Sequence, residues 1–246
     1  MAIRAYVKEK QKGRVQTTVH LMSYVSLMAG AVLLFWAYYP IISFEIYSRL
    51  FINQILNTPI PRSEIATSLS NVQQVLGSYN AFSSNLRDFV QANVWFPSKP
   101  QNLVAINLAV KKYTMSIPKL NINNAQVLVG GEDLSKSLVH YLPQSLPGEY
   151  GNVAIFGHST LPQMYNVKDY KTIFTHLPSL EKGDKVYATV ENREYEYEVY
   201  DMFIVKPEQV SVLEQKLDDA YLTLITCVPP GTYWNRLVVR AKMVKR

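Results

Sequence analysis

The stretch Tyr221–Ala241, YLTLITCVPPGTYWNRLVVRA, decides the architecture of the chain. It holds two runs rich in Val, Ile, Leu and Thr on either side of a Pro-Pro-Gly loop, and this composition predicts two antiparallel strands. In such a hairpin Arg236 lies across from Cys227, whereas Arg240 is displaced by about four residues, on the order of 13 Å along the strand. Both arginines share one face of the strand. The position along the strand therefore selects Arg236 as the cation beside the Cys227 thiol.

Similar short runs continue upstream of the hairpin. Turn signals separate them, and seven or more strands in about 135 residues with few helices predict a sandwich or a closed barrel. One of these runs alternates Glu194, Glu196 and Glu198 with apolar residues, which is typical of a half-buried strand with an acidic face; a calcium site is the alternative. The runs are Tyr113–Ile117, Ala125–Val129, Asn152–Phe156, Lys185–Val190, Glu194–Val205, Tyr221–Thr226 and Arg236–Val244.

The charge of the chain is concentrated at its N-terminus. The 246 residues include 25 Lys or Arg and 19 Asp or Glu, a formal charge of +6. Residues 1–18 carry five basic side chains against Glu9 alone, so this arm holds 5 − 1 = +4 of the excess. A nucleic-acid-binding domain would spread its basic residues over a folded face. We therefore expect no nucleic-acid partner.

The residues after the basic arm predict a membrane anchor. Val15–Phe44 contains no Asp, Glu, Lys or Arg, and about 20 apolar residues in a helix cross the hydrocarbon core. We assign residues 1–18 to a cytoplasmic arm and 19–44 to a transmembrane signal anchor, because basic residues flank the cytoplasmic side. The alternatives are a cleaved signal peptide, whose small-residue triplet Ala29–Ala31 would precede the most apolar stretch, and a buried core helix.

The next 66 residues, 45–110, are interpreted as a stalk or linker with helical pieces. Residues 45–60 could continue the helix, and Ser63–Phe89 has loosely helical apolar spacing. The region is rich in Ser, Asn and Gln, which suits a connection better than a core.

Cys227 is the single cysteine, which excludes an internal disulfide and a zinc site built on cysteine pairs. A free cysteine is more often a buried structural side chain than a nucleophile. Here it ends a predicted strand beside a loop, where a substrate can reach it. In an exported chain an exposed thiol is also prone to oxidation, so we interpret Cys227 as a nucleophile.

A thiol nucleophile needs a partner for proton transfer, and four histidines are candidates. His20 begins the membrane span, and His176 belongs to a short helix or loop at the surface. His140 lies in Leu138–Pro143, either near a site or on a turn. His158 follows an apolar strand that stops at a glycine, the same strand-end position as Cys227, and is therefore our choice.

Four ordered segments resemble the signature motifs of the sortase family. Thr223–Cys227 followed by Arg236–Ala241 is similar to its TLxTC strand and arginine-bearing strand. The upstream segments are similar to its entry strand, its "LPGExGN…GH" segment and its "FxxLxxLxxGD" turn, and they are Ser116–Leu120, Leu146–His158 and Phe174–Asp184.

The resemblance implies a mainly β protein in which residues 111–246 form a closed eight-stranded sortase-type β-barrel. It further implies an extracytoplasmic cysteine transpeptidase that cleaves an LPxTG-like sorting signal between Thr and Gly. Cys227 would be the nucleophile, His158 the acid and base, and Arg236 the oxyanion stabiliser, while Thr226 would help orient the substrate. The partners would be proteins with a C-terminal sorting signal and an amine acceptor, either a cell-wall precursor or a pilin lysine. No metal or organic cofactor is implied.

Three features depart from the family pattern. Ser159-Thr160 follows His158 where many relatives have Arg, and the insert Leu161–Lys171 could shape the mouth of the site. Some pilin-polymerising members carry a lid with an Asp-Pro-aromatic motif, and Trp95-Phe96-Pro97 is its nearest counterpart here but lacks the Asp. Two rival functions stay open at this point. One is a cysteine hydrolase that releases surface proteins, and the other is a catalytically inactive, membrane-tethered binding module.

Overall fold

The computed structural model describes residues 14–54, 90–96 and 109–245. These residues divide into two units, one ending at Ser43 and one beginning at Phe44. The predicted helical pieces within Ser63–Phe89 lie outside the described residues.

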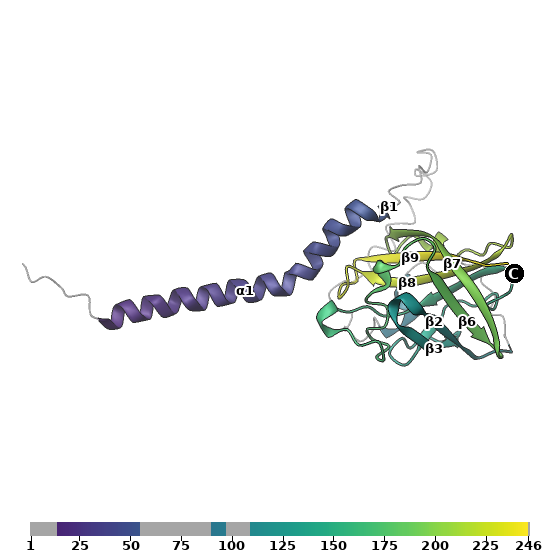
Figure 1. Ribbon diagram of the computed structural model, residues 1–246, viewed down its shortest axis with the longest axis horizontal. Coiled ribbons are helices and arrows are strands. Elements are labelled where there is room, and N and C mark those ends of the chain that lie inside the picture. The colour runs from purple at the N-terminus through teal and green to yellow at the C-terminus, as the bar shows by residue number, and fades with distance from the viewer. Residues whose placement is uncertain (1–13, 55–89, 97–108, 246) are drawn as a thin grey trace, which may run out of the picture. The chain divides into compact units, whose positions relative to one another are not determined.

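The N-terminal unit consists of helix α1, which runs from Arg14 to Phe51 and so continues into the second unit (Figure 1). Its segment Thr18–Leu50 has a mean hydropathy of 1.8 and is long and apolar enough to cross a membrane. The helix fits the expected anchor. It continues seven residues beyond the predicted span and ends at Phe51, so residues 45–51 are helical as predicted, while residues 55–60 lie outside the described residues.

The second unit is a closed barrel of eight strands, as expected. The sheet order is β7-β6-β2-β3-β4-β5-β8-β9, and β9 pairs back with β7 to close the ring (Figure 1). The two-residue strand β1, Asn53–Gln54, adds to β7 in parallel outside the ring. The barrel strands are β2 (Lys112–Ile117), β3 (Ile122–Val129), β4 (Leu138–His140), β5 (Gly151–Phe156), β6 (Lys185–Val190), β7 (Arg193–Val205), β8 (Ala220–Val228) and β9 (Asn235–Met243).

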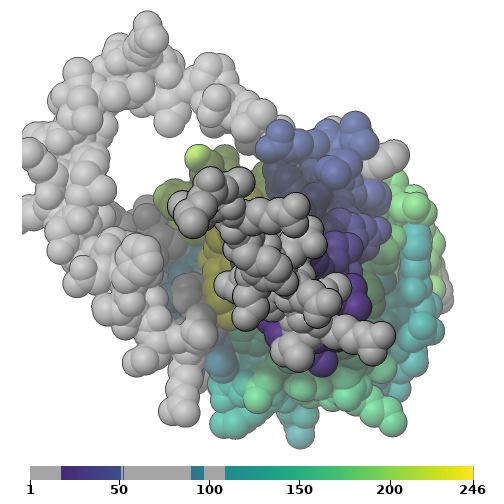
Figure 2. Space-filling view, turned by 90° about the vertical axis from the view of Figure 1, so that its left-hand side faces the viewer, coloured from purple at the N-terminus to yellow at the C-terminus, as the bar shows by residue number. Residues whose placement is uncertain are grey.

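Short 3-10 helices occupy several of the connections. They are η2 (Ala92–Val94), η3 (Pro118–Leu120), η4 (Pro162–Met164), η5 (Leu177–Ser179) and η6 (Val210–Leu213). In the space-filling view of Figure 2, teal surface from the first barrel strands adjoins green surface from later in the chain.

Side-chain alternation divides the apolar residues between two clusters. In β5, Val153 and Ile155 join a cluster to which all eight barrel strands contribute, and which therefore fills the barrel. Ala154 and Phe156 point to the opposite face and join a second cluster, here called the outer apolar cluster. Its buried members are Ala92, Trp95, Phe96, Leu134, Val139, Tyr141, Ala154, Phe156, Phe203, Val205, Val212, Leu213, Ile225, Cys227 and Val238.

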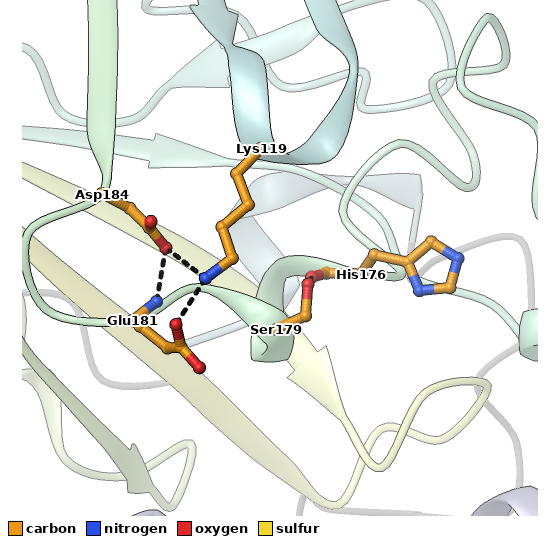
Figure 3. A network of polar contacts seen from close by, with 5 residues as sticks. All are labelled: Lys119, His176, Ser179, Glu181 and Asp184. Carbon is orange, nitrogen blue, oxygen red and sulfur yellow. Dashed lines mark hydrogen bonds and ion pairs between the residues drawn. The ribbon is translucent and has the colours of Figure 1, made fainter.

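An ion-pair network joins η3, which follows β2, to the turn before β6 (Figure 3). The Lys119 ammonium lies 2.7 Å from a Glu181 carboxylate oxygen and 3.0 Å from one of Asp184. Asp184 also accepts a hydrogen bond of 2.6 Å from the Glu181 backbone N–H. On the neighbouring η5, the Ser179 hydroxyl donates to the carbonyl of His176, whose side chain is at the surface as predicted. The network fixes a turn on the side of the barrel.

The acidic face of β7 is paired with a lysine. The Lys185 ammonium on β6 lies 2.6 Å from Glu198 and 3.3 Å from Glu196, and these contacts raise its pKa. Within the described residues, no group of three or more His, Cys, Asp and Glu side chains could hold a metal ion. The pairing with Lys185 fits the predicted half-buried strand with an acidic face, and no such ligand group among the described residues supports the alternative of a calcium site.

His140 lies on β4, a strand that the composition did not predict. Its ring is fully buried, neither ring nitrogen has a hydrogen-bond partner among the described residues, and the Tyr113 ring lies edge-on to it with the centroids 6.0 Å apart. Burial lowers the pKa of His140 to about 3. The barrel therefore holds a neutral imidazole that the unfolded chain protonates at a higher pH.

This difference predicts how acid affects stability. Because the pKa of His140 is lower in the folded than in the unfolded chain, stability is complete above about pH 6.5 and falls as the pH drops toward 3. We expect His140→Phe to lose about 2 kcal/mol less of its free energy of unfolding between pH 7 and pH 5 than the wild type does. Chemical denaturation at the two pH values measures this. Tyr113→Phe, which alters the same place without removing the imidazole, should behave as the wild type; equal losses in His140→Phe and wild type contradict the assignment.

Candidate active site

Strands β8 and β9 place Cys227 directly opposite Arg236. The antiparallel register pairs these two residues, and it pairs Arg240 with Thr223, four positions away. The hairpin register expected from the sequence is therefore confirmed. The Arg240 guanidinium lies over the ring of Phe203, 5.0 Å from its centroid, instead of beside the thiol.

Strand β5 brings His158 to the same end of the barrel as Cys227. β5 and β8 are parallel neighbours whose last paired residues are Phe156 and Ile225, and the chain continues through Gly157 to His158. A β-carbon on Gly157 would lie within 2.6 Å of side chains from Phe174 and Leu138, so only glycine fits there. Gly157, at which the predicted strand stops, thus allows Phe174 and Leu138 to pack closely against the chain just before His158.

The Arg236 guanidinium is buried and held by main-chain carbonyl groups. Its Nε and Nη2 atoms donate to the Trp95 carbonyl oxygen at 3.2 and 2.9 Å, and Nη1 donates to the carbonyls of Tyr233 and Asn235 at 3.0 and 3.3 Å. Hydrogen bonds from a charged donor are stronger than neutral ones. A forked pair of donors to one carbonyl oxygen is also the arrangement that a bound peptide carbonyl could accept.

The segment Val90–Phe96, here called the covering segment, packs against His158 and Arg236 through Trp95. The Trp95 ring is fully buried, with its centroid 5.6 Å from that of His158 and 5.5 Å from the Arg236 guanidinium carbon. The ring also stacks on Phe156 at 5.3 Å. The sequence suggested Trp95-Phe96-Pro97 only as a distant counterpart of a lid. The structure places the Trp95 ring close to the side chains of both His158 and Arg236.

Backbone hydrogen bonds attach the covering segment to the β3–β4 connection. Gln91 and Asp133 form an antiparallel bridge, the Ala92 N–H donates to Glu132 at 2.8 Å, and the Leu134 N–H donates to Val90 at 3.0 Å. The aspartate of an Asp-Pro-aromatic motif is not needed for this attachment. The Trp95 carbonyl instead contacts the arginine.

Burial under the covering segment keeps both titratable groups neutral. It raises the pKa of the Cys227 thiol to about 11, although Arg236 acts in the opposite direction. It lowers the pKa of His158 to about 4, an effect that Asp133 partly offsets. The thiol is only 2% exposed, and Nε2 of His158 has no hydrogen-bond partner in the described part of the chain. In the covered arrangement the pair is thiol and imidazole, which is the less reactive protonation state.

Hydrogen bonds of the Asn152 and Gln215 side chains join β5 to the β7–β8 connection beside the outer apolar cluster. The Asn152 side chain donates to the carbonyls of Val212 and Glu214, both at 3.1 Å, and accepts from the Thr223 hydroxyl at 2.6 Å. The Gln215 side chain bonds to the backbone N–H and carbonyl of Asn152 at 2.8 and 3.0 Å. These contacts fix the β7–β8 connection, whose Val212 packs in the same cluster as Cys227. No local sequence pattern predicts these hydrogen bonds.

The Thr226 hydroxyl is buried and donates to the Gly157 carbonyl at 2.8 Å. It therefore links β8 to the chain just before His158, and its role toward a substrate stays a prediction.

The insert Leu161–Lys171 reaches the β8–β9 loop through Leu161, which lies against Gly231. The insert thus adjoins the candidate site, in line with the expectation that it shapes the mouth.

The covering segment leads to a prediction about thiol reactivity. If Trp95→Ala exposes the thiol and its pKa falls from about 11 toward 9, the thiolate fraction at pH 8 rises roughly 10- to 100-fold. We expect Cys227 to be alkylated by iodoacetamide faster by about that factor, as measured by mass spectrometry.

The matched control is Trp234→Ala, because Trp234 is 63% exposed on the adjacent loop and should leave the alkylation rate unchanged. An unchanged rate in Trp95→Ala, with the fold retained, would show that the segment does not control access to the thiol.

Curated relatives of the chain are sortases. It is 29% identical to Sortase A of Bacillus anthracis over 56% of this chain and 58% of that protein. It is 28% identical to Sortase D of Bacillus subtilis over 53% of this chain and 62% of that protein. The alignments thus span less than two thirds of these relatives. Among solved structures, sortase C-1 from Actinomyces oris is 28% identical with a TM-score of 0.46, covering 55% of this chain and 73% of that chain.

The sortase domain model matches residues 115–244, which is more than half of the chain. The matched region contains β8 and β9 with the paired Cys227 and Arg236, and it contains His158 at the end of β5. The resemblance found in the sequence motifs is thereby confirmed, and the chain belongs to the sortase family.

Proposed function

We propose that the chain is a membrane-anchored cysteine transpeptidase that cleaves an LPxTG-like sorting signal between Thr and Gly and transfers the acyl group to an amine. The observation that carries this proposal is the direct pairing of Cys227 with Arg236 next to β5, with His158 two residues beyond the end of that strand. The membrane assignment is supported by the apolar segment Thr18–Leu50, with the basic arm on the cytoplasmic side and the barrel outside.

The first half of the reaction forms a thioester. A proton moves from the Cys227 thiol to His158, and the thiolate attacks the carbonyl carbon of the threonine. The Arg236 guanidinium, with its forked donors, stabilises the negative oxygen that develops. The carbon–nitrogen bond then breaks, and His158 gives its proton to the leaving glycine amine. The result is an acyl-Cys227 thioester and a neutral imidazole.

The second half reverses the roles. The acceptor amine attacks the thioester carbon and transfers one proton to His158, the carbon–sulfur bond breaks, and the thiolate is released. The acceptor is an amine of a cell-wall precursor or of a pilin lysine. These steps use only groups of this chain and of its two substrates, in keeping with a reaction that needs no cofactor.

The covering segment must leave before substrate can bind. Arg236 cannot donate to a substrate carbonyl while its Nε and Nη2 atoms are bonded to the Trp95 carbonyl. A sorting signal that displaces Trp95 supplies a replacement carbonyl. It also brings a more polar environment to the thiol and the imidazole, which moves their pKa values closer together and favours the thiolate–imidazolium pair.

Mass spectrometry of the full chain in detergent with a pool of LPxTG-type peptides tests the proposed function. We expect an acyl adduct on Cys227 and, when a glycine-based amine is added, a peptide product joined to that amine. Cys227→Ala should give neither species. An adduct that is only hydrolysed, even with amine present, would indicate a cysteine hydrolase, and no adduct with any peptide would contradict the proposed enzyme and favour a binding module.

The two arginines give a second, residue-level test. Arg236→Ala should lower kcat/KM by about 10²- to 10³-fold, the usual effect of losing one oxyanion donor. Arg240→Ala should change kcat/KM by less than about threefold, because Arg240 lies opposite Thr223 and over Phe203. Equal losses in the two variants would contradict the assignment of Arg236.

A further inference from the structure

Three hydrogen bonds connect β8 to the chain around His158, beyond the last paired residues of β5 and β8. The Gly157 N–H donates to the carbonyl of Ile225 at 3.1 Å, and the Thr226 hydroxyl donates to the carbonyl of Gly157 at 2.8 Å. The Ser159 hydroxyl donates to the carbonyl of Cys227 at 2.6 Å, the shortest of the three. The residues on both sides of His158 are therefore bonded to β8, and one of these bonds ends on the nucleophile's own main chain.

The Ser159 contact differs from the other two because it lies beyond the glycine, where the chain leaves the sheet. The His158 carbonyl accepts from the Phe174 N–H at 2.9 Å, and the Thr160 N–H donates to the Thr175 hydroxyl at 3.0 Å. Those two bonds tie this segment to the connection before β6. Of the contacts described for Ser159 and its neighbours Thr160 and His158, the Ser159 hydroxyl bond is the one that ties the segment directly to Cys227.

No hydrogen bond described for the His158 ring fixes its position relative to the thiol. Nε2 has no hydrogen-bond partner among the described residues, and the ring packs edge-on against Trp95. In the proposed function Trp95 leaves when substrate enters, and this packing is then lost. The distance between the imidazole and the thiol would then depend on the main-chain connection between the two strand ends.

We propose that Ser159 is a positioning residue that keeps His158 within proton-transfer reach of Cys227 by holding the carbonyl of Cys227. This inference rests on the proposed function, because it assigns Ser159 a part in that reaction. Ser159 touches no reacting atom in this arrangement. Misplacing two catalytic groups by about 1 Å can lower the rate by about 100-fold, so the loss of this hydrogen bond should affect proton transfer more than substrate binding.

The test compares Ser159→Ala, Ser159→Thr and Ser179→Ala in the full chain. Ser159→Thr keeps a hydroxyl. Ser179→Ala is the matched control, because the Ser179 hydroxyl likewise donates to a main-chain carbonyl, that of His176 at 2.8 Å, on η5. We expect Ser159→Ala to lower kcat for acylation by roughly tenfold with KM changed less than twofold, and Ser159→Thr to restore most of the rate. Ser179→Ala should retain wild-type values.

A second measurement needs no sorting-signal peptide. The pH dependence of Cys227 alkylation by iodoacetamide, measured in a Trp95→Ala background that removes the covering ring, should change when His158→Ala is added, because an imidazolium close to the thiol favours the thiolate. Adding Ser159→Ala to the same background should shift the profile toward that of the variant lacking His158, while circular dichroism and the melting temperature show a retained fold.

The outcomes separate the two proposals. If the wild type forms no acyl adduct, the transpeptidase proposal fails and the alkylation profile alone decides whether Ser159 positions His158. If the wild type is acylated but Ser159→Ala has unchanged kcat and an unchanged alkylation profile, the positioning role is overturned. A rise in KM alone, or a loss that Ser159→Thr does not rescue, overturns it as well.

Discussion

The pairing of Cys227 with Arg236 is the constraint on which the rest of the site depends. It places a permanent cation beside a thiol at the end of a buried strand, where a charge is costly unless it is hydrogen-bonded. The chain meets this requirement with three main-chain carbonyls, which belong to Tyr233 in the β8–β9 connection, to Asn235 at the start of β9 and to Trp95. The Trp95 carbonyl comes from a segment 141 positions away in the sequence. The covering segment therefore supplies a hydrogen-bond acceptor to Arg236 and also shields the Cys227 thiol.

This arrangement accounts for a covered site in which the thiol and the imidazole are both neutral. Withdrawing Trp95 without a replacement would leave part of a buried guanidinium unpaired, and that loss favours the covered form. A peptide carbonyl can take the place of the Trp95 carbonyl, so a substrate that binds along the outer apolar cluster can compensate for opening. The same exchange relieves the burial that holds the pKa of Cys227 high and that of His158 low.

The sequence predicted those parts of the fold and site that depend on local pattern. Alternating apolar runs and turn residues located seven of the barrel strands, and hairpin register alone placed Arg236 opposite Cys227. The three-residue strand β4, Leu138–His140, was missed because it is too short to show a period. The attachment of Trp95 to Arg236 and that of Asn152 to the β7–β8 connection could not be predicted, because each joins segments that are distant in the sequence.

In the proposed function, a substrate carbonyl replaces the Trp95 carbonyl on Arg236. A crystal structure of the full chain with a thiol-reactive sorting-signal analogue attached to Cys227 tests this exchange. We expect the Arg236 donors to contact the carbonyl of the analogue and Trp95 to have left its place beside His158. An adduct in which the hydrogen bonds from Arg236 to the Trp95 carbonyl, 2.9 and 3.2 Å here, are still present would contradict it.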